Sequence, residues 1–119
     1  MGSISRAYAL SELGEYITAA QALGTELLES VSTSEWVALS EWIAFCFERE
    51  GKFEEAGGWY ETAAELSLLE LGTRPTASAS VALHFFELAC ACYEREGNAV
   101  SASRAAMLSR LLVVRCPAV

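Results

Sequence analysis

The sequence has little proline and little positive charge, and each shortage excludes a class of protein. Only two prolines occur, Pro75 and Pro117. No run of Val, Ile and Thr alternates with polar residues as in a half-buried strand, so we expect no β-sheet. Eight basic residues against sixteen acidic ones leave a net charge of −8. This charge repels a polyanion, so we expect no nucleic-acid binding.

Long apolar runs are also missing. The longest stretch without charge is the twelve residues between Arg74 and Glu87, so we expect no membrane-spanning segment. Arg6 and Glu12 interrupt any apolar core of a signal peptide. The four cysteines are then expected to be reduced thiols in a cytoplasmic protein.

The residue sets of most catalytic and metal sites are absent as well. The one histidine, His84, has Ser80 and Leu88 at helical spacing, and neither an acid nor a nucleophile completes a triad with it. Cys90 and Cys92 would point about 200° apart on a helix and cannot share one ion. We therefore expect that the chain is not an enzyme and that it binds neither a metal nor a cofactor.

Ala, Leu and Glu dominate the sequence and favour helix throughout. Glycine recurs just past amphipathic stretches, where helices commonly end, at Gly14, Gly51, Gly72 and Gly97. The segment 32–35 has the sequence of a capping box. We expect one all-α domain over residues 1–119, with six helices at about 3–13, 15–31, 34–50, 52–71, 77–96 and 98–115.

Three parts of the chain are similar to one another. A shift of 46 residues aligns the segment 46–51 with 92–97, and the sequence Glu-Arg-Glu-Gly is identical in both. Cys46 and Cys92 hold equivalent positions, where we expect small core residues. A shift of 37 residues aligns Gly14 with Gly51 and Ala19 with Ala56. We expect each copy to form an antiparallel helical hairpin, over about 3–31, 34–71 and 77–115.

The second copy resembles the tetratricopeptide repeat. Phe47 ends its first helix and Gly51 forms the turn. Its second helix then presents an aromatic, a small and a second aromatic residue, at Phe53, Ala56 and Tyr60. The resemblance implies three helical hairpins stacked as a short right-handed solenoid. A helical bundle with accidental self-similarity is the alternative.

The third copy departs from this pattern, because Ala99 and Ala106 occupy its two aromatic positions. The second and third copies are 46 residues apart, which resembles the long repeats of kinesin light chains and related bacterial proteins. In those repeats Leu-Gly often precedes a Pro-containing loop, and the segment 71–75 has this sequence. This resemblance implies long fourth and fifth helices. Gly57 and Gly58 lie inside the fourth, and we expect Phe85 and Phe86 to pack closely there, with partner contact as the alternative.

In such a solenoid the first helix of each hairpin packs inward with one stripe and lines a concave groove with another. We take Ser40, Ile43, Ala44 and Phe47 as the packing stripe of the third helix. The expected groove residues are Ala38, Glu41, Trp42, Phe45, Glu48 and Arg49, and in the third copy His84, Glu87, Leu88, Ala91, Glu94 and Arg95. Trp42 and Phe45 lie three apart and form a candidate binding anchor, and their burial by a neighbouring helix is the alternative.

The groove chemistry predicts the class of partner. Some tetratricopeptide proteins hold acidic C-terminal tails with Lys, Arg and Asn, and Glu41, Trp42, Phe45, His84 and Leu88 stand at those positions here. An apolar protein segment with some basic residues suits this groove better. We expect a non-enzymatic protein-interaction module, an adaptor, a scaffold or a small chaperone such as those of type III secretion. The alternatives are an obligate homo-oligomer and a fragment of a longer repeat array.

The last expected helix is apolar on more than one face. Its charges are Arg104, Arg110 and Arg115 alone. We expect another chain, most simply a two-fold related copy, to bury part of Met107, Leu108, Leu111, Leu112 and Val114 in a homodimer or a hetero-complex. A tail that folds back, or scattered exposed residues, is the alternative.

Overall fold

The computed structural model describes residues 2–29, 32–69 and 75–115, and these residues form six α-helices and no strand. The helices are α1 (Gly2–Glu12), α2 (Tyr16–Glu29), α3 (Thr33–Arg49), α4 (Phe53–Leu68), α5 (Pro75–Arg95) and α6 (Ala99–Arg115). The prediction of an all-α fold of six helices is confirmed. The Leu-Gly sequence expected before the Pro-containing loop, at Leu71 and Gly72, lies outside the described residues.

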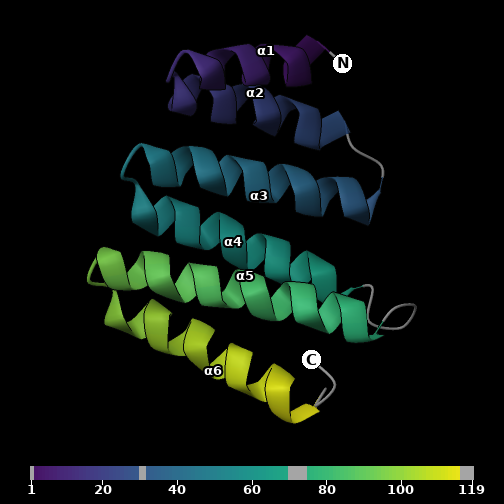
Figure 1. The fold of residues 1–119 in the computed structure, drawn as a ribbon, viewed down its shortest axis with the longest axis vertical. Coiled ribbons are helices and arrows are strands. Elements are labelled where there is room, and N and C mark those ends of the chain that lie inside the picture. Colours follow the sequence, from purple (N-terminus) through teal and green to yellow (C-terminus); the bar gives the residue numbers. More distant parts are fainter. Residues whose placement is uncertain (1, 30–31, 70–74, 116–119) are drawn as a thin grey trace.

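The helices stack in chain order as three antiparallel hairpins, with α1 and α6 at the two ends (Figure 1). Each helix packs against the helices that precede and follow it in the sequence. The stack measures 41 × 35 × 19 Å along its principal axes. The hairpin arrangement is therefore confirmed, whereas the right-handed sense of the stack and the tetratricopeptide assignment stay predictions.

The three hairpin turns share one backbone geometry. Gly14, Gly51 and Gly97 have φ angles of +79°, +76° and +76°, which glycine adopts without the steric cost of a side chain. In each turn the next residue donates its N–H to the carbonyl five residues earlier, at 2.8 Å for Glu15 and 2.9 Å for Lys52 and Asn98. This is the Schellman arrangement of a helix C-terminus. The sequence repeat is thus also a repeat of backbone structure.

Two helices begin with side-chain caps. Ser32 Oγ accepts the N–H of Glu35 at 3.1 Å, so the predicted N-cap of α3 is present, and the Ser32 hydroxyl donates to Glu35 Oε1 at 3.1 Å in place of the backbone bond of a full capping box. Asn98 Oδ1 accepts the N–H of Ser101 at 3.1 Å at the start of α6. Lys52, which precedes α4, forms no side-chain cap.

Only one of the two helices expected to be long is long. α5 has 21 residues and begins at Pro75, whose fixed φ suits the first position of a helix. α4 has 16 residues and ends at Leu68, three residues before the expected end. Leu69 donates its N–H to the Leu66 carbonyl at 3.1 Å, a tight closure that commonly ends a helix.

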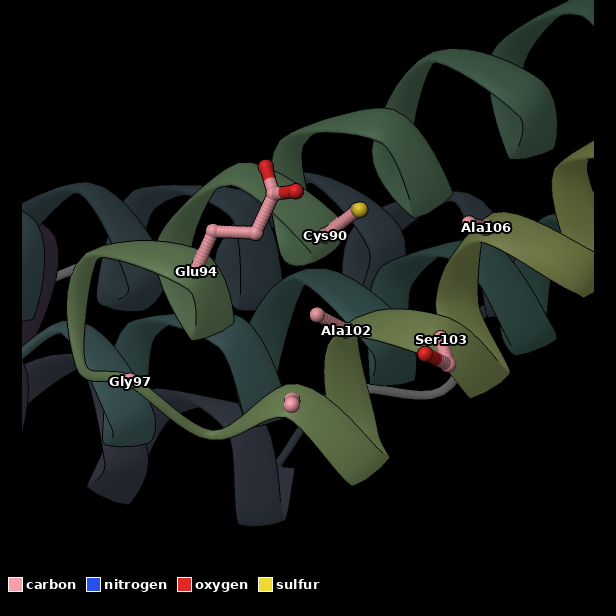
Figure 2. A pocket seen from close by; sticks show the side chains of 7 residues that line it. Cys90, Glu94, Gly97, Ala102, Ser103 and Ala106 are labelled. Carbon is pink, nitrogen blue, oxygen red and sulfur yellow. The ribbon is translucent and has the colours of Figure 1, made fainter.

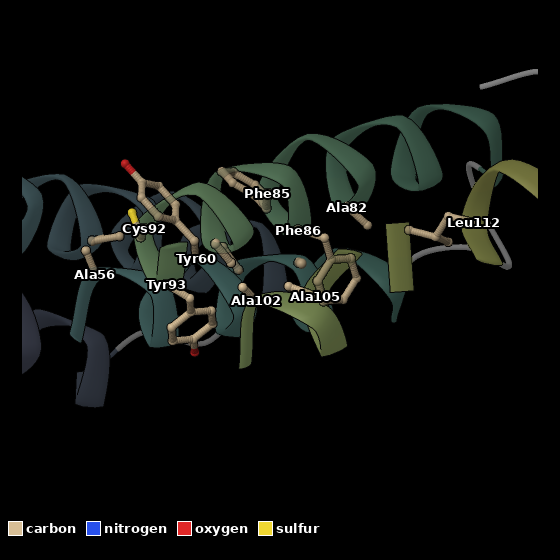
Figure 3. Close-up of a cluster of buried hydrophobic side chains, with 14 of the residues drawn as sticks. Ala56, Tyr60, Ala82, Phe85, Phe86, Cys92, Tyr93, Ala102, Ala105 and Leu112 are labelled. Atoms are coloured by element: carbon tan, nitrogen blue, oxygen red, sulfur yellow. The ribbon is translucent and has the colours of Figure 1, made fainter. Parts of the chain in front are cut away.

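Buried apolar side chains form two clusters. The C-terminal cluster lies among α3, α4, α5 and α6 and is rich in rings (Figure 3). Its largest members are Tyr60, Phe85, Phe86 and Tyr93. The N-terminal cluster lies among α1, α2 and α3, and its buried members are aliphatic side chains and one thiol, namely Ala7, Ala19, Ala20, Leu23, Leu39, Ile43 and Cys46.

The glycine pair of α4 is explained by α5, but not by the residues expected. A Cβ atom at Gly57 would lie 2.9 Å from Cε1 of Tyr93, so Tyr93 is the ring that requires the missing side chain. The expectation that Phe85 and Phe86 cross at this point is wrong, because the crossing lies two turns further along α5. At Gly58 the nearest atom is the Tyr93 hydroxyl at 3.9 Å, which leaves room for a methyl group.

Candidate functional site

The burial of α3 side chains follows the two stripes assigned from the sequence. On the packing stripe Ser40, Ile43 and Ala44 are buried and Phe47 is half-buried. The expected groove residues are mostly exposed, namely Ala38, Glu41, Phe45 and Arg49 on α3 and His84, Glu87, Ala91, Glu94 and Arg95 on α5. Trp42, Glu48 and Leu88 are half-buried. The two helices therefore present equivalent faces, and the binding role of these faces stays a prediction.

Four of the groove residues surround one hollow between α3 and α4. Its volume is about 300 Å³, and its lining residues are Ala38, Glu41, Trp42, Phe45 and Tyr60. Phe45 is 46% exposed, whereas Trp42 also packs against the N-terminal cluster. The alternative stated for the sequence was that a neighbouring helix buries both rings. Trp42 is partly buried in this way, whereas Phe45 is not.

Tyr60 joins this hollow to α5, a role that sequence reasoning missed. Its hydroxyl donates to Glu48 Oε1 at 2.8 Å, and its ring stacks on Phe85 with centroids 6.3 Å apart. Burial, followed by the bond to Glu48, raises the pKa of Tyr60 above its ordinary value. The hydroxyl thus stays protonated and fixes the wall of the hollow. The one signal for this role in the sequence was that Tyr60 occupies an aromatic position of the repeat.

Arg49 lies between two rings, one of which is the Phe45 ring that lines the hollow. Its guanidinium carbon is 5.8 Å from the ring centroids of both Tyr16 and Phe45. Arg95, at the same position of the third copy, lies 4.3 Å from the ring centroid of Phe53. Each such contact contributes about 0.5–1 kcal/mol at an exposed site. Arg49 is therefore engaged with the neighbouring hairpin and supports Phe45.

The groove residues of α5 do not line the α3 hollow. Glu87 and Ala91 line a separate hollow of about 310 Å³, together with Ala106 and Arg110 of α6. His84 packs beside Phe85, with ring centroids 5.8 Å apart. Neither His84 nor Leu88 lines this hollow or the α3 hollow. They also do not line a third cavity, which lies between the ends of α5 and α6 that meet at the last turn.

That cavity of about 300 Å³, which we call the end cavity, lies beside the last turn (Figure 2). It is lined by Cys90 and Glu94 of α5, Gly97 of the turn, and Ala99, Ala102, Ser103 and Ala106 of α6. In the second hairpin the positions of Ala99 and Ala106 hold Phe53 and Tyr60. Two small side chains in place of two rings leave this space open.

The predicted interface residues of α6 divide into two groups. Met107 is 52% exposed and Leu111 is 47% exposed. Leu112 belongs to the C-terminal cluster and Leu108 packs against it, so the uncovered part of this apolar set is at Met107 and Leu111, and its burial by another chain stays a prediction. Leu108 and Leu112 lie on the side of α6 that faces α5. The composition of a helix alone does not specify which of its sides faces a neighbour. The side chain of Val114 lies outside the described residues.

The described thiols are free and two of them are deeply buried. Cys46 and Cys92 are 0% and 3% exposed, as expected for small core residues. Burial raises the pKa of Cys92 to about 11 and also raises the pKa of Cys46. Among residues 2–29, 32–69 and 75–115, no three His, Cys, Asp or Glu side chains gather as metal ligands do.

Comparison with known protein families, curated proteins and solved structures finds no match. None of the described helices is long and apolar enough to cross a membrane. Functional inference therefore depends on the surfaces of the stack itself.

Proposed function

We propose that this chain is a non-enzymatic protein-interaction module that binds an apolar segment of another protein at the α3 hollow, as an adaptor, a scaffold or a small chaperone. The observation that carries the proposal is the exposure of Phe45, 46%, beside a hollow of about 300 Å³. An aromatic side chain next to a preformed pocket is typical of an interface hot spot. The resemblance to the tetratricopeptide repeat supports the same function.

The charges around the hollow select the chemistry of the partner. Glu41 is exposed in its wall and Glu87 is exposed on the neighbouring α5 face. Arg49 already lies over Phe45, and the whole chain has a net charge of −8. A segment with apolar residues on one side and lysine or arginine on the other complements this surface.

A pair of synthetic peptides tests the proposal. Both are amphipathic helices of about 16 residues with Leu and Phe on one face, about four turns in length. The other face has Lys in one peptide and Glu in its partner. Fluorescence polarisation of labelled peptides should show saturable binding of the Lys peptide and little binding of the Glu peptide. Equal binding of both, or of neither, would contradict the proposed groove chemistry.

Phe45→Ala is the sharper of two variants at the hollow. Loss of this exposed ring should weaken the Lys peptide by roughly tenfold or more, with little change in unfolding stability. Leu28→Ala, which removes an 85% exposed side chain away from the hollow, is the matched control and should bind as the wild type does. Trp42→Ala should weaken binding and also lower stability, because Trp42 packs against the N-terminal cluster.

A further inference from the structure

The two ends of the stack present faces whose equivalents are covered inside it (Figure 1). α3 packs on α2, and α5 packs on α4. The repeat shifts align Arg6 of α1 with Ile43 of α3 and Ala89 of α5. Ile43 and Ala89 are buried, whereas Arg6 is exposed. At the other end, Ser103 and Ala106 of α6 correspond to Gly57 and Tyr60 of α4, which contact α5.

Side chains that meet across the α4–α5 interface have complementary counterparts at the two ends. Tyr93 of α5 donates its hydroxyl to Glu61 of α4. The repeat shifts align Leu10 of α1 with Tyr93, and Met107 of α6 with Glu61. Met107 is 52% exposed and Leu10 is half-buried. A polar pair inside the stack is thus replaced by an apolar pair divided between its ends.

Side-chain size shows the same complementarity one turn away. Tyr60 of α4 stacks on Phe85, and Ala89 lies in the next turn of α5 within the same cluster. The counterparts at the ends are Ala106 for Tyr60 and Arg6 for Ala89. Inside the stack the large residue is on α4 and the small one is on α5. At the ends the small residue is on α6 and the large one is on α1. The space left by Ala106 is the end cavity.

Charge adds a third match. Glu94 borders the end cavity and corresponds to Glu48, which accepts the Tyr60 hydroxyl. Ala106 has no hydroxyl, and among the described residues no donor or cation pairs with the Glu94 carboxylate. The guanidinium of Arg6 likewise has no acidic partner among the described residues. A guanidinium and a carboxylate form strong charge-assisted hydrogen bonds.

We infer that copies of this chain stack head to tail, with α1 of one copy seated on the α5–α6 end of the next. Arg6 of the incoming copy occupies the end cavity and pairs with Glu94, and its Leu10 packs on Met107. The contact joins two different faces, so it continues from copy to copy and does not close as a two-fold dimer does. This inference uses a surface separate from the α3 hollow and does not depend on the proposed function.

The mass of the 119-residue chain in solution tests the inference directly. Sedimentation equilibrium between about 5 and 500 µM covers the range of weak specific contacts. The weight-average mass should rise steadily with concentration and pass the dimer value. A mass that stays at one chain over the whole range would overturn the inference.

Two variants block opposite ends of the stack. Arg6→Glu places a carboxylate against Glu94 and blocks the α1 end. Ala106→Tyr fills the end cavity as Tyr60 fills the equivalent space in the second hairpin, and it blocks the α6 end. Each variant alone should be a monomer, and a double variant should be one as well. An equimolar mixture of the two single variants should form a 1:1 dimer and stop there, because one intact end remains on each.

Controls separate this arrangement from other contacts. Arg6→Lys keeps the positive charge and should still associate. Glu94→Arg serves if Ala106→Tyr does not fold, and it should be monomeric alone but associate when mixed with Arg6→Glu. Circular dichroism and thermal unfolding establish that each variant is folded. Single variants that associate like the wild type, or a mixture that stays monomeric, would show that a different surface mediates association.

Discussion

The α4–α5 interface and the α2–α3 interface occupy equivalent places in the stack and are packed differently. In the first, Tyr60 and Tyr93 each bury a ring and donate a hydroxyl to a carboxylate. In the second, the equivalent positions hold Leu23 and Phe47, which have no hydroxyl. The same backbone repeat therefore accepts either polar-anchored rings or purely apolar packing.

The anchored rings also connect α6 to α4. Glu61 accepts the Tyr93 hydroxyl and two hydrogen bonds from Arg104, at 2.7 Å from Nη2 and 3.2 Å from Nε. The Arg104 side chain is 51% exposed, so this ion pair contributes about 0.2–1 kcal/mol at most. The difference between the interfaces therefore lies mainly in the buried rings of α4 and α5, and variants in the two clusters measure it.

The largest effect is expected from the rings of the C-terminal cluster. Phe86 is 1% exposed, and Phe86→Ala should lower the free energy of unfolding by about 3–5 kcal/mol. Leu23→Ala, at a fully buried site of the N-terminal cluster, should cost about 2–4 kcal/mol. Urea unfolding of both variants, with the 42% exposed Val81→Ala as the control, makes the comparison. A greater loss for Leu23→Ala would reverse our ranking of the two clusters.

The adjacent glycines of α4 should respond with opposite signs. Gly57→Ala places a methyl group against the Tyr93 ring and should destabilise the chain by about 1–2 kcal/mol. Gly58→Ala meets no atom closer than 3.9 Å and should stabilise it by up to about 1 kcal/mol, because alanine favours helix. Thermal unfolding distinguishes the two, and stabilisation by both would mean that the ring yields easily.

Alkaline pH should weaken the C-terminal cluster through three groups, whereas Cys46 is the one described residue of the N-terminal cluster whose pKa is raised. The pKa of Cys92 is raised from 9.0 to about 11 by burial, and the pKa values of Tyr60 and Tyr93 are raised as well. Their contributions to stability are fully present below the unfolded-state pKa values and are lost as pH rises above them. The unfolding temperature should therefore fall between pH 9 and 11.

Two variants assign this alkaline loss. Cys92→Ala should remove the part of the loss that occurs between pH 9 and 11, and Tyr60→Phe should remove part of the loss above pH 10. The measurement is the unfolding temperature by circular dichroism at closely spaced pH values. An unchanged pH dependence in both variants would place the titrating groups elsewhere in the chain.

The smallest effect concerns the start of the second helices. Asn98 caps α6, whereas Lys52 at the same position provides no cap to α4. Lys52→Asn should add about 0.5–1 kcal/mol, and Asn98→Ala should remove about 1 kcal/mol. Chemical unfolding resolves such differences when the slope of the transition is unchanged. Loss of stability in Lys52→Asn would show that the backbone at this position does not accept a cap.

Much of the fold was predictable because its signals are local. The glycine at each hairpin turn and the N-cap at Ser32 are short patterns with a direct physical meaning. Burial of Cys46 and Cys92 also followed, since both occupy the same position of the repeat. Helix ends were less accurate, as in α4, because the closure at Leu69 depends on the backbone alone.

The site was less predictable because it depends on how helices slide and rotate against one another. The register of α5 on α4 decides that Tyr93, and not Phe85, meets Gly57. The rotation of α6 decides that Leu112 is buried while Met107 is exposed. Neither register nor rotation is encoded in any short pattern. The space left by Ala99 and Ala106 was visible in the sequence as a departure from the repeat.

Packing between consecutive helices has a consequence for the history of this chain. Since α1 to α6 pack chiefly on their immediate neighbours, most contacts join segments close in sequence. In such stacks stability is approximately a sum of hairpin terms and nearest-neighbour terms, and folding spreads outward from any unit. A hairpin can therefore be gained or lost by duplication or deletion of one stretch of the gene, with the rest of the stack left as it was.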